Sequence, residues 1–531
     1  MMKSTDIIAQ GLEKGWKVTD AATLQDDQTL EADVVVIGTG AGGGTTAEIL
    51  AKAGLRVIMV EEGRLYHQKH FTMDEHWSYS RLYQEGLGRV TKDGGIAILQ
   101  GRCVGGSTTV NWTSSFRTPE QTLKHWQERF GVKECEPETL APWFEDREKR
   151  QKIATWAADP NPNNTVLKTG CEQLGWHWDT IPRNVNGCWD LGYCGFGCPT
   201  NAKQGMLVTT VPGALDHGSE LIHSLRAEKL IHANGKIQAL EAVALDGEAL
   251  RPTGRRVTLK ARHFVLSASA LGSPALLLRS GVPDPYGRIG KRTFLHPVNA
   301  TVAEMPEKVE PYYGAPQSIY SDEFVWRDGV AGAVGFKLEV PPLQPGMAAG
   351  IIPQHGKAMT ATMDRFPYIN SVIALLRDGF HEQSEGGTVS LRDDGSPVLD
   401  YPMTDYLWAG MRDAYERMVE IQFAAGAKSV SLVHLDSPAF TSVADAKRKM
   451  ADIPMALHRA RLFTAHQMGG CAMGEDAEMA VVNSFGEHHQ LENLNIHDAS
   501  IFPTSIGANP QLSIYALSAR NAQRLSRRLK A

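Results

Sequence analysis

A glycine-rich turn near the start of the chain limits most strongly what this sequence can fold into. The six residues before it, 32–37, are Ala-Asp-Val-Val-Val-Ile, a β-branched run typical of a buried parallel strand. Residues 46–54, after it, are rich in alanine and end in glycine, as helices often do. The turn between them carries three glycines: Gly38, Gly40 and Gly43. Strand, glycine turn and helix in this order are typical of a dinucleotide-binding fold.

A second apolar run completes this pattern. Residues 55–60 are typical of a strand, and Glu61 follows them, 23 residues beyond Gly38. The glycines permit a tight turn and a close approach of the backbone to a pyrophosphate, while an acid at this position receives the ribose hydroxyls. The sequence therefore predicts a Rossmann-like α/β domain that binds a dinucleotide. This pattern alone does not separate NAD from FAD.

Length and composition exclude several other classes of protein. A chain of 531 residues is too long for one simple core, so we expect two intertwined domains. Its net charge of −6 argues against nucleic acid as a partner. It has no run of about eighteen apolar residues, and residues 1–30 contain charged side chains but no apolar block. We therefore expect a soluble chain without a transmembrane helix or a signal peptide.

Further segments decide between the two cofactors. Residues 101–111 (Gly-Arg-Cys-Val-Gly-Gly-Ser-Thr-Thr-Val-Asn) resemble the first signature of the glucose–methanol–choline (GMC) oxidoreductase family of FAD enzymes. Residues 269–282 resemble its second signature, with a departure at Pro283, where the family usually has glycine. Residues 466–474 and 494–510 resemble its closing segments. The likenesses occur in the family's order and span nearly the whole chain.

The resemblance implies the cofactor, the fold and the residues that hold the cofactor. FAD would lie in a Rossmann-like domain assembled from residues 30–130, 203–297 and 463–531. An α+β substrate-binding domain, residues 298–462, would roof the flavin, and residues 131–202 would form a lid and cysteine-loop segment. The residues implied to bind FAD are Gly38, Gly40, Gly43, Glu61, Gly105, Gly106, Ser107, Asn111, Ala227, Asp498, Ala499, Asn509 and Pro510.

The same likeness indicates two catalytic residues. His466 matches the position of the family's catalytic histidine, and Asn509 matches that of its partner. Oxidation of an alcohol needs a base for the hydroxyl proton, and histidine suits this because its pKa lies near neutral. His466 would take the proton, Asn509 would orient the hydroxyl oxygen, and flavin N5 would accept the hydride. His296 would lie near the flavin, in a structural or a catalytic role.

Residues 197–205, 295–298 and 373–378 resemble motifs of the long-chain alcohol oxidase branch of this family. This implies a small-molecule substrate, a primary, medium- to long-chain aliphatic alcohol. Residues 393–397 predict only a turn between two strands. The candidates for an aliphatic pocket, with ordinary core as the alternative, are Met347, Ile351, Ile352, Met359, Met363, Phe366, Ile373 and Leu375.

Three of the seven cysteines lie within eleven residues, at Cys188, Cys194 and Cys198. Clustered thiols in a cysteine-poor chain indicate a metal, a redox centre or a disulfide, and the glycines between them resemble an iron–sulfur loop. Their spacing resembles the three-iron loop in catalytic subunits of bacterial FAD-dependent glucose dehydrogenases, which are also GMC proteins. This likeness implies a [3Fe-4S] cluster. A disulfide with a buried thiol, or three core cysteines, are the alternatives.

The sequence as a whole predicts an FAD-dependent dehydrogenase that oxidises primary alcohols to aldehydes. A cluster carries one electron at a time, so electrons would leave through it to a quinone or a cytochrome. The glucose dehydrogenase likeness also implies a small companion subunit and attachment to the inner membrane through a partner, with a cytoplasmic location otherwise. Two alternatives stay open: an oxygen-using long-chain alcohol oxidase that forms hydrogen peroxide, and a GMC-fold lyase with structural FAD.

Overall fold

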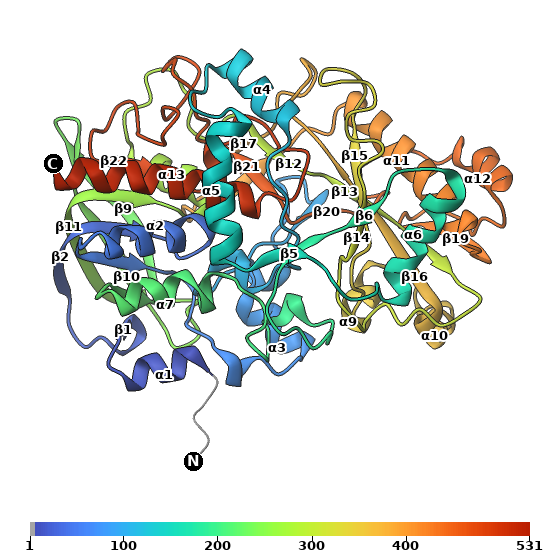
Figure 1. Cartoon of the computed structure of the whole chain (residues 1–531), viewed down its shortest axis with the longest axis horizontal. Helices are drawn as coiled ribbons and strands as arrows, with labels where there is room; N and C mark the ends of the chain where they lie inside the picture. The colour runs from blue at the N-terminus through green and yellow to red at the C-terminus, as the bar shows by residue number, and fades with distance from the viewer. Residues whose placement is uncertain (1–5) are drawn as a thin grey trace.

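Two large β-sheets, each covered by helices, make up this protein (Figure 1). The structure is a computed structural model and describes residues 6–531. The sheet that contains the strand before the first glycine turn occupies one half of the molecule, and the second sheet occupies the other half. Each sheet has its own apolar core. The domain bounds expected from the sequence stay a prediction.

The first sheet contains the predicted dinucleotide-binding strands. Its order is β1-β8-β3-β2-β11-β10-β9, parallel from β1 to β11 and antiparallel from there to β9, with β22 parallel to β11. β2 includes residues 32–37 and begins earlier, so the predicted strand is confirmed and is longer than expected. The bounds are β1 Lys17–Asp20, β8 Glu220–His223, β3 Val57–Val60, β2 Gln28–Ile37, β11 Pro252–Leu266, β10 Lys236–Leu245, β9 Leu225–Ala233 and β22 Leu494–Ile496.

The second sheet has the order β4-β20-β13-β16-β15-β14-β6, with β19 paired to β13. Strand β16 lies between β13 and β15, so Leu375 has Val298 on one side and Lys337 on the other. Asn299 lies on the opposite face and donates to the carbonyl oxygen of Met411 in α11. The bounds are β4 Ile96–Ile98, β20 Leu462–Thr464, β13 Val298–Glu304, β16 Ile369–Leu376, β15 Phe336–Glu339, β14 Ile319–Ser321, β6 Asp179–Thr180 and β19 Ser429–Leu432.

Three short strand pairs and the helices complete the fold. Residues 388–391 form a strand that pairs with its neighbour in a hairpin and does not join the second sheet. The pairs are β12 Thr293–Leu295 with β21 Gln467–Gly469, β17 Thr388–Leu391 with β18 Pro397–Asp400, and β5 Ile153–Thr155 with β7 Pro182–Asn184. The helices are α1 Ile7–Glu13, α2 Ala41–Lys52, α3 Glu75–Leu82, α4 Glu120–Phe130, α5 Pro137–Arg150, α6 Pro162–Leu174, α7 Thr210–Asp216, α8 Ser269–Ser280, α9 Pro345–Ile351, α10 Gly356–Asp364, α11 Asp405–Ala424, α12 Val443–Met450 and α13 Gln511–Lys530.

The helix after the glycine turn begins earlier than its composition predicts. α2 starts at Ala41, five residues before the expected start, with Gly40 as its N-cap. Glycine is a poor helix former, but tertiary packing overrides that preference here. A Cβ atom on Gly42 would lie 1.6 Å from the carbonyl oxygen of His497, in the loop after β22. Only glycine therefore permits this close contact between α2 and the loop.

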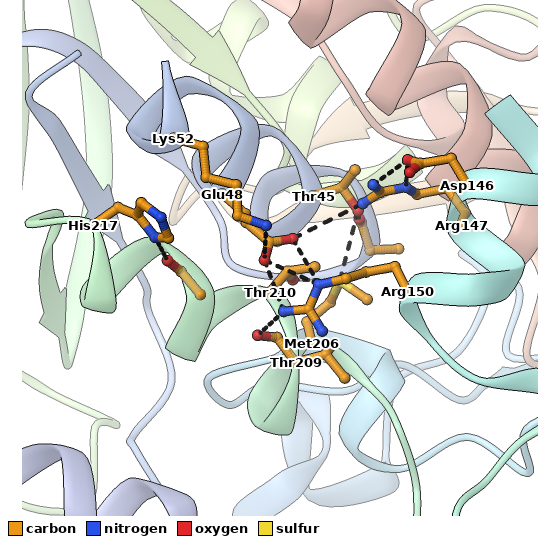
Figure 2. A network of polar contacts seen from close by, with 12 residues as sticks. Thr45, Glu48, Lys52, Asp146, Arg147, Arg150, Met206, Thr209, Thr210 and His217 are labelled. Carbon is orange, nitrogen blue, oxygen red and sulfur yellow. Dashed lines mark hydrogen bonds and ion pairs between the residues drawn. The ribbon is translucent and has the colours of Figure 1, made fainter. Parts of the chain in front are cut away.

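A buried carboxylate joins α2 to α5 and α7 (Figure 2). Glu48 of α2 is 1% exposed and accepts a 2.7 Å hydrogen bond from Nη2 of Arg150 in α5, and Nε of Arg150 also donates to it. Nζ of Lys52 lies 2.9 Å from the same carboxylate. Arg150 donates further to the carbonyl oxygen of Thr209, at the start of α7. The network thus fastens a helix of the expected lid segment to the nucleotide-binding helix.

Within residues 6–531, no helix combines the length and the apolar composition needed to cross a membrane. The longest helices are α11 and α13, and both carry several charged side chains.

Candidate active site

A cavity of about 760 Å³ is lined by residues of both halves of the molecule, and two glycine turns form part of its wall. Gly106, in the first family signature, has a φ of 55°, a left-handed conformation that favours glycine. A Cβ atom on Gly106 would lie 2.8 Å from Cα of Gly40 in the dinucleotide turn. The two turns therefore meet backbone to backbone at the cavity.

Most residues expected to bind the cofactor line this cavity. They are Gly38, Gly40, Glu61, Gly106, Ser107, Asn111, Ala227, Asp498, Ala499, Asn509 and Pro510, together with His466.

Two of the expected residues, Gly43 and Gly105, do not line the cavity. A Cβ atom on Gly43 would lie 1.9 Å from the carbonyl oxygen of Gly38, so this glycine permits tight packing of α2 on the turn. Gly105 has a φ of 89° and donates its N–H to the hydroxyl of Thr39 at 3.0 Å. Both glycines shape the cavity wall from behind without bordering the cavity.

Glu61 follows β3 with its carboxylate turned toward the dinucleotide turn. It accepts hydrogen bonds from the hydroxyl of Thr39 at 2.6 Å, from the N–H of Thr39 at 3.1 Å and from the N–H of Gly63 at 2.9 Å. Burial raises the pKa of Glu61, and these hydrogen bonds oppose the rise. Glu62 instead lies 2.9 Å from Arg102. Burial acts to raise the pKa of Glu62, but Arg102, with Arg226 and Arg89 nearby, outweighs burial and the pKa is lowered.

His466 and His296 meet beside the cavity. Their Nδ1 atoms lie 3.0 Å apart, and their rings are nearly perpendicular, at 85°. The antiparallel pairing of β12 with β21 brings them together, because His296 follows β12 and His466 precedes β21. Burial lowers the pKa of His466 to about 4. The pKa of His296 lies well below its usual range, through burial first and then through His466 and Lys337.

Asn509 contacts a buried acid that the sequence analysis missed. Its Nδ2 donates to Oε2 of Glu339 in β15 at 3.3 Å. Lys337 lies two residues before Glu339, and its ammonium is 3.4 Å from the ring centre of Phe116. Burial raises the pKa of Glu339 to about 7 and lowers that of Lys337 to about 8. Two charged residues at a spacing of two within an apolar strand were the available signal, because alternation places them on one face.

An apolar wall faces the polar residues of the cavity. Val298, Ile373, Leu375 and Phe463 line the cavity and pack together in one apolar cluster. Ile373 and Leu375 are thus the two members of the expected aliphatic pocket that border the cavity. The other six, which lie outside its lining, are Met347, Ile351, Ile352, Met359, Met363 and Phe366.

The turn at residues 393–397 contributes more than the sequence analysis expected. It joins β17 to β18, as predicted, and four of its residues line the cavity together with Arg392. Nη1 of Arg279 in α8 donates to the carbonyl oxygen of Gly395 at 3.0 Å. This contact fastens the hairpin to α8, so that a segment far along the chain closes one side of the cavity.

Lys203 links the cysteine loop to the cavity wall, but the three clustered thiols do not form a metal site. In the part of the chain that the structure describes, no group of three or more His, Cys, Asp or Glu side chains is arranged to hold a metal ion. Cys188, Cys194 and Cys198 are free thiols. Nζ of Lys203 donates to the carbonyl oxygens of Cys194 at 2.7 Å and Asn111 at 3.0 Å. Lys203 therefore joins the loop to the first family signature. Because the thiols are not arranged to hold a metal ion, the expected [3Fe-4S] cluster has no support in this structure.

The chemistry of the cavity fits FAD, the cofactor that the family likeness implies. Gly40 caps α2 without a side chain, so the first N–H groups of this helix are open to a pyrophosphate. The Oδ1 atoms of Asn111 and Asn509 are buried, and neither has a hydrogen-bond partner within residues 6–531. Both asparagines border the cavity. Glu61 and the glycine turn would hold the nucleotide, and these two amide oxygens are free for a ligand.

Comparisons with known proteins agree with this geometry. Two sequence models of the GMC oxidoreductase family match the chain, over residues 79–298 and over residues 382–518. An uncharacterized GMC-type oxidoreductase of Mycobacterium tuberculosis (strain H37Rv) is 31% identical over 507 residues, which cover 94% of this chain and 77% of that protein. Long-chain-alcohol oxidase FAO4A of Arabidopsis thaliana is 29% identical over 521 residues, which cover 94% of this chain and 69% of that protein.

Solved structures share the fold at lower identity. A crystal structure of formate oxidase has a TM-score of 0.70 and 15% identity, and the match covers 95% of this chain and all of that one. An FAD-dependent oxidoreductase from Chaetomium thermophilum has a TM-score of 0.65 and 14% identity, over 94% of this chain and 100% of that one. The predicted fold is confirmed, and FAD is the cofactor that these findings support. With family models on both halves and a relative above 30% identity, the chain belongs to the GMC oxidoreductase family.

Proposed function

We propose that this protein oxidises primary, medium- to long-chain aliphatic alcohols to aldehydes, with oxygen as the electron acceptor. The observation that carries the proposal is a single cavity bordered by the cofactor turns, by His466 and Asn509, and by an apolar wall that includes Ile373 and Leu375. The name of the Arabidopsis relative, a long-chain-alcohol oxidase, supports both the substrate class and the acceptor.

The chain's own residues would bind and orient the alcohol. His466 and Asn509 would hold the hydroxyl oxygen, and the apolar wall would bury the aliphatic chain, which stabilises binding by about 0.8 kcal/mol for each buried CH₂ group. FAD, when bound, would accept a hydride from the carbon that carries the hydroxyl. Oxygen would then take up the two electrons with two protons and be released as hydrogen peroxide. One alcohol and one oxygen molecule thus give one aldehyde and one peroxide. A base role for His466 stays a prediction from the family likeness.

The test uses the purified protein loaded with FAD and a series of straight-chain primary alcohols. We expect aldehyde and peroxide to form in equal amounts in air, with kcat/KM rising with chain length until the cavity is filled. If an alcohol does not bleach the flavin without oxygen, the proposal is wrong and FAD has a structural role, as in a lyase. If the alcohol bleaches the flavin without oxygen but no peroxide forms in air, the protein is a dehydrogenase.

A dehydrogenase with an iron–sulfur cluster is the second candidate, and one contact favours it. Lys203 bridges the carbonyl oxygens of Cys194 and Asn111, so the cysteine loop lies directly behind the first family signature. Iron and acid-labile sulfide in the anaerobically purified protein, measured beside its visible spectrum, test this candidate. Three further predictions depend on the cluster: the companion subunit, the quinone or cytochrome acceptor and the membrane attachment. They would be wrong if the protein contained no iron and sulfide.

A further inference from the structure

The surroundings of Gln511, the first residue of α13, fix the orientation of its amide. Its Nε2 donates to the carbonyl oxygen of Ser114 at 2.7 Å and to the hydroxyl of Ser115 at 2.8 Å. A peptide carbonyl can only accept a hydrogen bond, so the atom that faces Ser114 must belong to the NH₂ group. Oε1 of Gln511 is therefore the amide atom that meets Asn111 and Tyr515.

Gln511 in turn fixes the amide of Asn111, the last residue of the first family signature. Nδ2 of Asn111 donates to Oε1 of Gln511 at 2.7 Å. Turning the Asn111 amide over would set oxygen against oxygen at that distance, with no proton between them. The hydroxyl of Tyr515 also donates to Oε1, and burial raises the pKa of Tyr515, so this hydroxyl keeps its proton at pH 7. Amide groups do not titrate, so the arrangement does not depend on pH.

The other polar groups of Asn111 leave one atom free for a ligand. Its N–H donates to the carbonyl oxygen of Ser107 at 2.9 Å, and its carbonyl oxygen accepts from Nζ of Lys203 at 3.0 Å. Oδ1 is buried and has no hydrogen-bond partner among residues 6–531. Buried polar atoms are rarely left unpaired, because their loss of hydration is costly. Since Asn111 borders the cavity, its Oδ1 is suited to accept from a donor group of the ligand there.

The position of Asn111 favours the ring system of FAD as that ligand. Asn111 is bonded to Ser107, the neighbour of Gly106, and Gly106 meets the dinucleotide turn backbone to backbone. Gln511 follows Asn509 by two residues, so Asn111 also lies at the end of the cavity that contains the catalytic candidates. The isoalloxazine ring must reach this end if it is to accept a hydride. In its oxidised form the ring carries a single N–H group, at N3, and this group can only donate.

We infer that Oδ1 of Asn111 accepts a hydrogen bond from N3–H of the FAD ring, and that Gln511 is a positioning residue that sets this acceptor. Tyr515 lies four residues further along α13 and holds Gln511 in turn. The inference requires bound FAD but no particular substrate, so it goes beyond the proposed function. It stands even if the alcohol chemistry fails, because its tests follow the binding of the cofactor.

Two substitutions at Gln511 test the positioning role through FAD binding. In Gln511→Met the side chain keeps its length but cannot accept from Asn111, so the Asn111 amide can turn its NH₂ group toward the ring. We expect the Kd for FAD, measured by dialysis, to rise about tenfold, the size of one lost hydrogen bond. Gln511→Glu offers Nδ2 of Asn111 an oxygen in either ionisation state and should recover most of this loss. If the two variants weaken FAD binding equally, the inference is overturned.

Nitrogen-15 spectra of holoenzyme that contains FAD labelled at N3 test the contact itself, and they keep the inference testable if the variants fail to fold. In the wild type we expect N3–H to exchange with water much more slowly than in free FAD. Exchange as fast as in free FAD would overturn the inference. We also expect the N3–H signal to shift in Gln511→Met but not in Gln511→Glu. An unchanged signal in Gln511→Met would overturn the inference, and a raised alcohol KM in that variant would then identify the alcohol hydroxyl as the donor.

Discussion

The carboxylate of Glu61 lies 2.6 Å from the hydroxyl of Thr39 and joins the end of β3 to the dinucleotide turn. Glu62, the next residue, points to Arg102. This difference follows from strand alternation, which turns neighbouring side chains to opposite sides.

We expect Glu61→Ala to weaken FAD retention at least tenfold more than Glu62→Ala does, because only Glu61 contacts the turn that would hold the nucleotide. The loss corresponds to about 1.4 kcal/mol or more. Dialysis followed by measurement of the flavin that stays bound compares the two variants. Equal losses would show that Glu62 also contacts the nucleotide.

Replacement of His466 should slow the reaction without releasing the cofactor. We expect His466→Ala to lower kcat by about 10² to 10⁴, the usual range for a residue that takes part in proton transfer, while FAD content stays at the wild-type level. His217→Ala changes an exposed histidine and serves as the control. Near-normal turnover in His466→Ala would remove His466 from the catalytic site.

The hydrogen bonds and ion pairs of Glu48 with Arg150 and Lys52 should stabilise the folded protein. Removal of one partner of a fully buried ion pair typically costs about 3–5 kcal/mol, but Arg150 and Lys52 are 30% and 47% exposed, so we expect a smaller cost of about 1–3 kcal/mol. We therefore expect Glu48→Gln to lower the thermal midpoint clearly, since Arg150 loses its main partner. The exposed pair Lys124–Glu128 is the matched control, because Glu128→Gln should change little. A midpoint equal to that of the control variant would contradict the prediction.

Stability should also depend on pH through buried neutral histidines. Burial lowers the pKa of His263 to about 3, below the value of about 6.5 in an unfolded chain. The unfolded chain therefore binds the proton first, and the contribution of His263, complete above pH 6.5, is lost as the pH falls toward 3. Between pH 7.5 and 5 this amounts to about 2 kcal/mol.

The variant His263→Gln isolates this contribution from the buried carboxyl groups. Burial raises the pKa of Glu339 and Asp378, so these two groups act with the opposite sign. We expect the thermal midpoint of His263→Gln to fall less between pH 7.5 and 5 than that of the wild type. If the thermal midpoints of the two proteins fell equally between pH 7.5 and 5, His263 would not be the source of the pH dependence.

The sequence by itself determined the local elements and the chemistry of the cofactor turn. A β-branched strand, closely spaced glycines and an acid after the next strand leave few alternatives, because each residue type meets a local backbone or hydrogen-bond requirement. The same holds for the hairpin turn at residues 393–397. Most residues of the expected site line one cavity.

Only the tertiary structure decided which side chains meet at the site. His466 contacts His296, 170 residues earlier, and His296 in turn accepts a hydrogen bond from the N–H of Gly507. The amide of Asn509 donates to Glu339, a residue that the sequence pattern shows only as a charge within an apolar strand. The thiol spacing in the cysteine loop resembles that of a cluster loop, yet in the part of the chain that the structure describes the three thiols are not arranged to hold a metal ion. Contacts between residues distant in the chain set these features, and no local pattern encodes which groups meet.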